Sequence, residues 1–257
     1  MTPSGRADKI LAAMSPSDAK ILDRRDLPEY VTAIVVIIIS LGLYAFLKLT
    51  GEVVDGDTVG FDQQLLLMLR NPADLADPVG PEWLEVIVRD LTALGGAVTL
   101  GMLTIAVCGY FWLQLRPRMA LFVLLAMAGG SLFNSLLKEF FERPRPELVP
   151  HATAAAMSSF PSGHAMMSTV AFLTLGALLA HASSKLGIKL YILGWSLLLT
   201  ILVGVSRVYL GVHWPTDIIA GWIAGGVWAL LSLLACRWFM FDSPVRGQSK
   251  DPLRLQP

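Results

Sequence analysis

Eight residues of types that bind or attack phosphate fall into three short stretches of this sequence. They comprise three cations, a serine and glycine pair, two histidines and one carboxylate: Lys138, Arg145, Ser162, Gly163, His164, Arg207, His213 and Asp217. The stretches read Lys-x6-Arg-Pro, Pro-Ser-Gly-His and Ser-Arg-x5-His-x3-Asp. Hydrolysis of a phosphate ester needs an in-line nucleophile, positive charge beside the equatorial oxygens and a proton for the leaving oxygen. The three stretches contain residue types for each of these tasks.

The cations and the serine–glycine pair are predicted to bind the phosphate. Lys138, Arg145 and Arg207 would balance its charge of about −1.5 to −2, and guanidinium groups match phosphate oxygens two at a time. Ser162 and Gly163 follow Pro161, a residue favoured at the first position of a helix. A helix N-terminus offers free N–H groups to an anion, and glycine lets the backbone approach it closely.

His213 is the predicted nucleophile. A neutral imidazole can attack phosphorus when an acceptor holds its other ring nitrogen, and Asp217 is the predicted acceptor. Pro215 suggests that a helix begins there, with Asp217 in its first turn. We expect the imidazole of His213 to face the surface. His164 would protonate the leaving oxygen and later activate water.

The elements that position these residues are predicted to be membrane-spanning helices. The chain of 257 residues is 54% hydrophobic and 16% charged, with a mean hydropathy of +0.61, which is too apolar for an ordinary soluble domain. Six runs approach the roughly 20 apolar residues that a span requires. They are residues 30–49, 91–113, 119–137, 164–180, 190–209 and 218–241. The first run lacks a small-residue cleavage pattern, so we expect it to remain as a span. The predicted fold is therefore all-α, a six-transmembrane-helix bundle.

The distribution of Lys and Arg predicts the orientation of this bundle. With the N-terminus inside, most Lys and Arg residues lie on the inner side, as expected for cytoplasmic segments. The third predicted span ends at Lys138, the fourth begins at Pro-Ser-Gly-His, the fifth ends at Ser206-Arg207, and the sixth follows His213. All three stretches then meet at the outer membrane–water interface.

Three regions are predicted along the chain: a cytoplasmic N-terminal segment (1–29), a membrane domain (30–241) and a cytoplasmic tail (242–257). Within the domain, residues 50–88 form a long outer connection with an interfacial helix. For this helix we favour a plain linker over a lip that admits lipid. The connection carries acidic residues, namely Glu52, Asp55, Asp57 and Asp62.

Several polar residues near the three stretches are given no role in the chemistry. Arg143 falls outside the spacing of the first stretch, and we interpret it as a side chain that reaches towards lipid headgroups. We interpret Glu139, Glu142 and Glu147 as solvated partners of Arg143 and Arg145. His151 and His181 are interpreted as ordinary polar residues.

Taken together, the three stretches resemble the motifs of the phosphatidic acid phosphatase type 2 superfamily. This group includes bacterial undecaprenyl pyrophosphate phosphatases, lipid A phosphatases, glucose 6-phosphatase and vanadium haloperoxidases. The resemblance runs from Lys138 to Asp217 and includes Phe160 and residues 209–212. It implies an integral enzyme of the bacterial inner membrane that hydrolyses a lipid phosphate or pyrophosphate.

Undecaprenyl pyrophosphate is the expected substrate, on the resemblance rather than on any residue. Phosphatidic acid, phosphatidylglycerol phosphate and lipid A phosphate remain alternatives. A haloperoxidase would typically be soluble, and a transporter would show ionisable groups at mid-membrane. The chain lacks the carboxylate clusters that hold divalent metals, so we expect a phosphohistidine mechanism without metal or other cofactor. Membrane lipids are the expected surroundings, with no nucleic acid partner, and the sequence indicates no particular oligomeric state.

Overall fold

The computed structural model describes residues 29–146, 148–149 and 158–241. Residues 1–28 of the predicted N-terminal segment, the tail from 242 to 257, Glu147 and His151 lie outside the described residues. The chain divides into two units, residues 1–40 and 41–257. In the first unit residues 29–40 are helical, and all eight residues singled out above belong to the second.

Helices dominate the described chain. In order the elements are α3 (Glu29–Val54), α4 (Val59–Leu67), β1 (Arg70–Asn71), β2 (Asp74–Pro78), α5 (Glu82–Ala93), α6 (Ala97–Leu113), α7 (Pro117–Phe141), α8 (Gly163–His181), α9 (Leu186–Tyr209) and α10 (Pro215–Phe241). Among the described residues, five helices are long and apolar enough to cross a membrane, and α5 with α6 make a sixth span if the bent pair is counted as one. The predicted helical membrane fold is confirmed, with one short antiparallel hairpin, β1–β2, in the outer connection.

The second predicted span is broken rather than continuous. The sequence predicts one run over residues 91–113, whereas the structure ends α5 at Ala93 and begins α6 at Ala97, with a bend of 45°. Gly95 and Gly96 occupy the break, and Gly96 has the extended backbone of a helix N-cap. Glycine is a poor helix former, so the pair ends one helix within an apolar run.

Apolar side chains on the outside of α6 support a lipid environment. Val98, Ile105 and Leu113 are 77%, 74% and 84% exposed. A soluble monomer rarely presents such a continuous apolar surface to water. In a bilayer the same side chains contact lipid tails.

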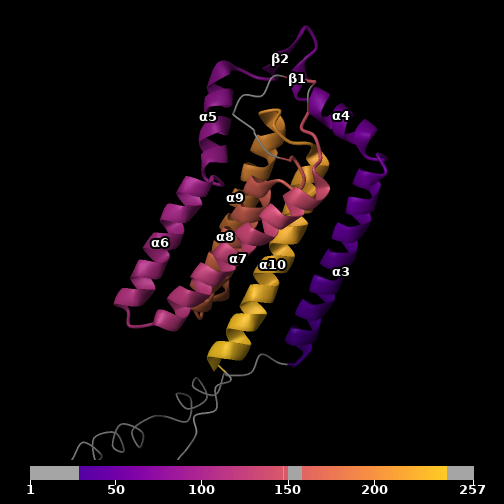
Figure 1. The fold of residues 1–257 in the computed structure, drawn as a ribbon. Coiled ribbons are helices and arrows are strands. Elements are labelled where there is room, and N and C mark those ends of the chain that lie inside the picture. The colour runs from indigo at the N-terminus through magenta and orange to yellow at the C-terminus, as the bar shows by residue number, and fades with distance from the viewer. Residues whose placement is uncertain (1–28, 147, 150–157, 242–257) are drawn as a thin grey trace, which may run out of the picture. The chain divides into compact units, whose positions relative to one another are not determined.

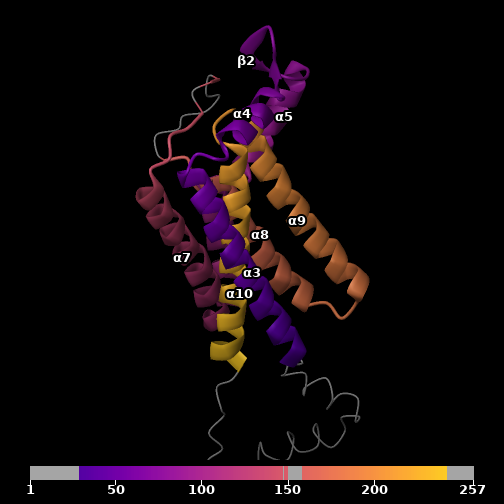
Figure 2. The same cartoon turned by 90° about the vertical axis from the view of Figure 1, so that its right-hand side faces the viewer.

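Helix α8 contacts α7, α9 and α10 (Figure 1). In the view of Figure 2, α8 and α10 lie between α7 and α9. One end of the bundle holds the C-terminal ends of α7 and α9 and the N-terminal ends of α8 and α10 (Figures 1 and 2). Each of the three stretches lies at one of these helix ends.

Candidate active site

Hydrogen bonds join the three stretches at this end of the bundle. The Nζ of Lys138 donates to the carbonyl oxygen of Ser158 (2.7 Å), and the backbone N–H of Ser162 donates to the carbonyl oxygen of Asp217 (3.0 Å). Arg145 Nη1 donates to the carbonyl oxygen of Val212 (2.8 Å). The structure thus brings together residues from three segments that are far apart in the sequence.

The start of α8 presents an anion site built on Ser162. Ser162 is the N-cap and its hydroxyl oxygen accepts from the N–H of Ala165, while α8 begins at Gly163. Pro161 therefore precedes the cap and does not occupy the first helical position, which proline favours. The bonds of Ala165 and Met166 to Ser162 leave the N–H groups of Gly163 and His164 without a partner among the described residues. A Cβ on Gly163 would lie 3.1 Å from Asn134 Nδ2, so glycine keeps this approach open.

A glycine turn at the end of α9 places His213. The N–H of Val212 donates to the carbonyl oxygen of Arg207 (3.2 Å), and that of Gly211 donates to Val208 (2.9 Å). This is the hydrogen-bond pattern of a Schellman motif, whose C′ residue adopts the left-handed conformation. Gly211 has φ +72°, as the motif requires. The chain then leaves the helix with His213 directed at the site.

Replacing Gly211 with Ala should destabilise this turn. A non-glycine residue in the left-handed region costs about 1–2 kcal/mol, and the added Cβ would lie 2.6 Å from Val149 Cγ2 and 2.7 Å from Arg70 Nη2. We expect a lower unfolding temperature in detergent and reduced turnover. Gly194→Ala, within α9, is the control, because its Cβ would meet nothing within 4 Å. Equal stability of the two variants would contradict this account of the turn.

The imidazole of His213 lies between a carboxylate and a guanidinium. Its Nδ1 is 3.4 Å from Asp217 Oδ2 and its Nε2 is 3.3 Å from Arg145 Nη1. Arginine can only donate, so Nε2 must accept and the ring proton belongs on Nδ1, facing the carboxylate. In this tautomer the lone pair of Nε2 points to the side of the cations. Pro215 is the first residue of α10 and Asp217 lies in its first turn, as predicted.

His213 is buried, which corrects the expectation of a surface-facing ring. It is only 2% exposed. Burial lowers its pKa from the ordinary value of 6.5 to about 4, although its hydrogen bond to Asp217 acts in the opposite direction. The imidazole is therefore neutral at neutral pH, the state in which it can act as a nucleophile.

Arg145 and Arg207 act on the imidazole of His213, and all three cations act on the imidazole of His164. The charges of Lys138, Arg145 and Arg207 act on one another, and all three are wholly or largely buried. Burial lowers the pKa of Arg145, an effect that the charge of Asp217 partly offsets. Arg207 Nη1 donates to Thr92 Oγ1 (3.0 Å) at the end of α5, whereas its buried Nε has no partner within the described part of the chain. Clustered cations with an orphaned buried donor fit an anionic ligand.

His164 lies beside the break between α5 and α6. A Cβ on Gly96 would be 3.9 Å from His164 Nε2, and one on Gly95 would be 3.3 Å from the His164 carbonyl oxygen. The imidazole also lies within electrostatic reach of His213 and the three cations. The bend in the second span is thus part of the wall of the site, which the sequence pattern did not indicate.

The structure overturns the interpretation of Arg143. Its side chain is 12% exposed and does not reach towards headgroups. Nη1 donates to Asp217 Oδ1 (2.6 Å) and Nη2 donates to Asp62 Oδ2 (2.7 Å). The repeated Arg-Pro at 143–146 was a signal that could have suggested a shared location with Arg145. For Asp62, which the sequence groups with exposed acids, no such signal exists.

Within residues 29–146, 148–149 and 158–241, no group of three or more His, Cys, Asp or Glu side chains is placed to hold a metal ion.

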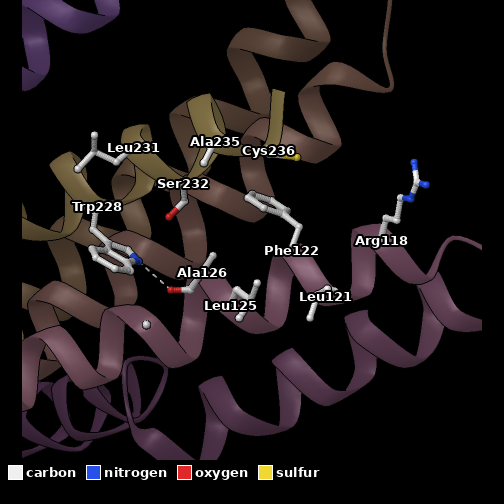
Figure 3. A pocket seen from close by; sticks show the side chains of 11 residues that line it. Arg118, Leu121, Phe122, Leu125, Ala126, Trp228, Leu231, Ser232, Ala235 and Cys236 are labelled. Carbon is white, nitrogen blue, oxygen red and sulfur yellow. Dashed lines mark hydrogen bonds between the residues drawn. The ribbon is translucent and has the colours of Figure 1, made fainter. Parts of the chain in front are cut away.

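A pocket of about 580 Å³ lies between α7 and α10 (Figure 3). Leu121, Phe122, Leu125 and Trp228 line it, with Arg118 at one end. It contains none of the eight residues above, and its apolar lining suits lipid chains rather than a phosphate group.

Comparison with known proteins places these residues in a wider group. Residues 119–241, which include all eight, match the PAP2 superfamily. The chain is 33% identical over 146 residues to phosphatidylglycerophosphatase B of Bacillus subtilis, covering 56% of this chain and 70% of that protein. It is 45% identical over 75 residues to an undecaprenyl-diphosphatase of Sulfolobus acidocaldarius, covering 29% of this chain and 32% of that protein. The crystal structure of a transmembrane PAP2-type phosphatidylglycerolphosphate phosphatase from Bacillus subtilis matches with a TM-score of 0.66 at 26% identity, covering 77% of this chain and 94% of that one.

Proposed function

Because the chain belongs to the PAP2 superfamily of membrane lipid phosphate phosphatases, we propose that it hydrolyses undecaprenyl pyrophosphate through a phosphohistidine on His213. The observation that carries this proposal is the position of His213 between Asp217 and Arg145. One ring nitrogen is held by a carboxylate, and the other faces the cations that would bind the phosphate.

In the first step Nε2 of His213 attacks the terminal phosphorus. The bond between this phosphorus and the bridging oxygen of the lipid pyrophosphate breaks at the same time. Lys138, Arg145 and Arg207 balance the charge on the equatorial oxygens, together with the N–H groups of Gly163 and His164. The Ser162 hydroxyl supplies a further donor. Asp217 accepts the Nδ1–H and stabilises the positive charge that develops on the ring. His164 protonates the oxygen of the departing lipid monophosphate.

In the second step water replaces the imidazole on phosphorus. His164, now deprotonated, takes a proton from the water as its oxygen bonds to phosphorus and the P–N bond breaks. Inorganic phosphate leaves, and both histidines return to their starting states. In this proposal the three cations and the backbone N–H groups at the start of α8 supply the charge stabilisation, so the mechanism requires no metal ion.

The membrane location suits a lipid substrate. The site lies at the helix ends, so the prenyl or acyl chains can stay in the bilayer while the headgroup reaches the cations. We assign this end to the outer face of the cell membrane, with both termini in the cytoplasm, on the distribution of Lys and Arg in the flanking segments.

Phosphatidylglycerol phosphate is the second candidate substrate. The longer alignment and the matching crystal structure are both to proteins named for phosphatases of this lipid. The 45% identity to the undecaprenyl-diphosphatase supports the first candidate over a shorter segment. The two lipids share the terminal phosphate group but differ in the tail and in the leaving group.

Phosphate release from purified protein in detergent tests the proposal. The panel contains undecaprenyl pyrophosphate, phosphatidylglycerol phosphate, phosphatidic acid and lipid A phosphate, each with and without a chelator. We expect the highest kcat/KM on undecaprenyl pyrophosphate and the same rates in chelator. A higher kcat/KM on phosphatidylglycerol phosphate would select the second candidate. Loss of activity in chelator that magnesium restores would contradict the metal-free mechanism.

A further inference from the structure

A buried series of charged side chains runs from helix α4 to the imidazole of His213. Asp62 Oδ2 is 2.7 Å from Arg143 Nη2, and Arg143 Nη1 is 2.6 Å from Asp217 Oδ1. The other oxygen of the same carboxylate, Asp217 Oδ2, faces His213 Nδ1 at 3.4 Å. Asp62 and Asp217 are both 0% exposed. Asp62 and helix α4 lie outside the segment that matches the superfamily, residues 119–241.

We propose that Asp62 and Arg143 are positioning residues that fix the Asp217 carboxylate so that its Oδ2 faces the nucleophile. The inference rests on the proposed function of His213. Arg143 occupies Oδ1, and the backbone N–H of Trp214 donates to Oδ2 (2.9 Å). With both oxygens held, the carboxylate cannot rotate away from the imidazole.

Asp62 also fixes the turn that carries Asp217. Its Oδ1 accepts from the backbone N–H of Thr216 (2.9 Å), and its Oδ2 accepts from the Thr216 hydroxyl (2.6 Å). Thr216 is the neighbour of Asp217 in the first turn of α10. Asp62 thus holds the backbone of this turn directly and its carboxylate through Arg143.

Arg143 is itself held in one place. Nη1 donates to Thr216 Oγ1 as well (2.9 Å), and the guanidinium carbon lies 5.8 Å from the centre of the Trp214 ring. The planar fork of arginine can bridge two carboxylates, whereas the single ammonium group of lysine cannot do so in the same geometry.

The arrangement is costly for a purely structural element. Buried ion pairs lose much of their attraction to desolvation, and apolar replacements of similar volume are often as stable. A role in orienting the nucleophile gives these charges a function. The charged and titratable groups that act on His213 are Asp217, Arg145 and Arg207, with His164 nearby, so Arg143 reaches the imidazole only through Asp217.

Asp62→Asn is the first test, with Asp57→Asn as the matched control. The two aspartates are five positions apart, but Asp57 is exposed. Misplacing a catalytic group through its support typically costs about 10- to 100-fold. We expect kcat to fall by this factor in Asp62→Asn with KM within about twofold, and Asp57→Asn to match the wild type. Unfolding temperature in detergent is measured for each protein.

Two Arg143 variants separate charge from geometry. Arg143→Lys keeps the charge but loses the bridge, so kcat should fall while the pH profile of kcat/KM stays in place. Arg143→Met removes the positive charge beside Asp217. The pKa of His213 should then rise, and the acidic limb of the kcat/KM profile should move to higher pH. Asp62 acts on the carboxylate of Asp217 through Arg143 and on the turn directly through Thr216. Asp62→Asn combined with Arg143→Met should therefore lose more kcat than Arg143→Met alone, but less than the product of the two single losses.

The outcomes divide clearly. Wild-type kcat in Asp62→Asn would overturn the inference. It would also be overturned if kcat in the Asp62 and Arg143 variants fell only in proportion to the fraction of folded protein and the pH profile of kcat/KM stayed unchanged in all of them. His213→Asn is assayed in the same series. If it kept turnover, the proposed function itself would fail, whereas an inactive His213→Asn beside a fully active Asp62→Asn would overturn only the positioning role.

Discussion

Replacing His213 with Asn should reduce phosphate release by at least about 10⁴-fold, because the variant has no ring nitrogen to attack phosphorus. Asn is a better replacement than Ala. The ring is buried, so Ala would leave a cavity and remove the imidazole donor that faces Asp217 Oδ2, whereas the Asn amide can still donate to this oxygen. The measurement is single-turnover phosphate release from the preferred lipid, with unfolding temperature as the control for folding.

The acidity of His213 adds a pH dependence to this prediction. The nucleophile must be neutral, and burial lowers its pKa to about 4. As pH falls through this value the imidazole takes up a proton and kcat/KM should fall, while between about pH 5 and 7 this group should cause no change. A wild-type profile that declined near pH 6.5 would indicate a solvated imidazole and contradict the buried geometry. Retention of more than a small fraction of activity in His213→Asn would exclude the phosphohistidine.

The sequence predicts the helices of this protein well because bilayer thickness constrains apolar runs. Five of the six predicted runs each lie within one long helix, the run 91–113 covers the end of α5 and the whole of α6, and Pro215 marks the start of α10. The break at Gly95 and Gly96 escaped prediction because those residues are themselves compatible with an apolar run. Their role depends on the proximity of His164, which is a tertiary feature.

The predicted site residues converge because each is tied to a helix end, and helix ends in a bundle meet at one surface. Burial is harder to predict, since it depends on what covers that surface. Helix α4 contacts α10, and it brings Asp62 into a buried position that a cluster of acidic residues in the sequence does not suggest. Arg143 was misjudged for the same reason, because its partners Asp62 and Asp217 lie 81 and 74 residues away in the chain.

Asp217→Asn should reduce kcat by about 10³- to 10⁴-fold. The carboxylate fixes the proton on Nδ1 and stabilises the charged ring, and loss of the equivalent group in a serine protease triad costs about 10⁴-fold through the wrong tautomer. An Asn amide that donates to Nδ1 would move the ring proton to Nε2 and remove the attacking lone pair. Arg143 would also lose one of its two carboxylate partners.

Vanadate binding distinguishes this catalytic loss from a collapsed site. Vanadate adopts the five-coordinate geometry of the transferring phosphoryl group, and the cations that would bind it are unchanged in Asp217→Asn. We therefore expect its inhibition constant, measured on the residual activity, to stay within a few-fold of the wild type while kcat falls. The hydrogen bond to Asp217 raises the pKa of His213, so its loss should move the acidic limb of the kcat/KM profile to lower pH, the opposite of Arg143→Met. If vanadate inhibition weakened as much as turnover, Asp217 would be a support for the cation site rather than the partner of the nucleophile.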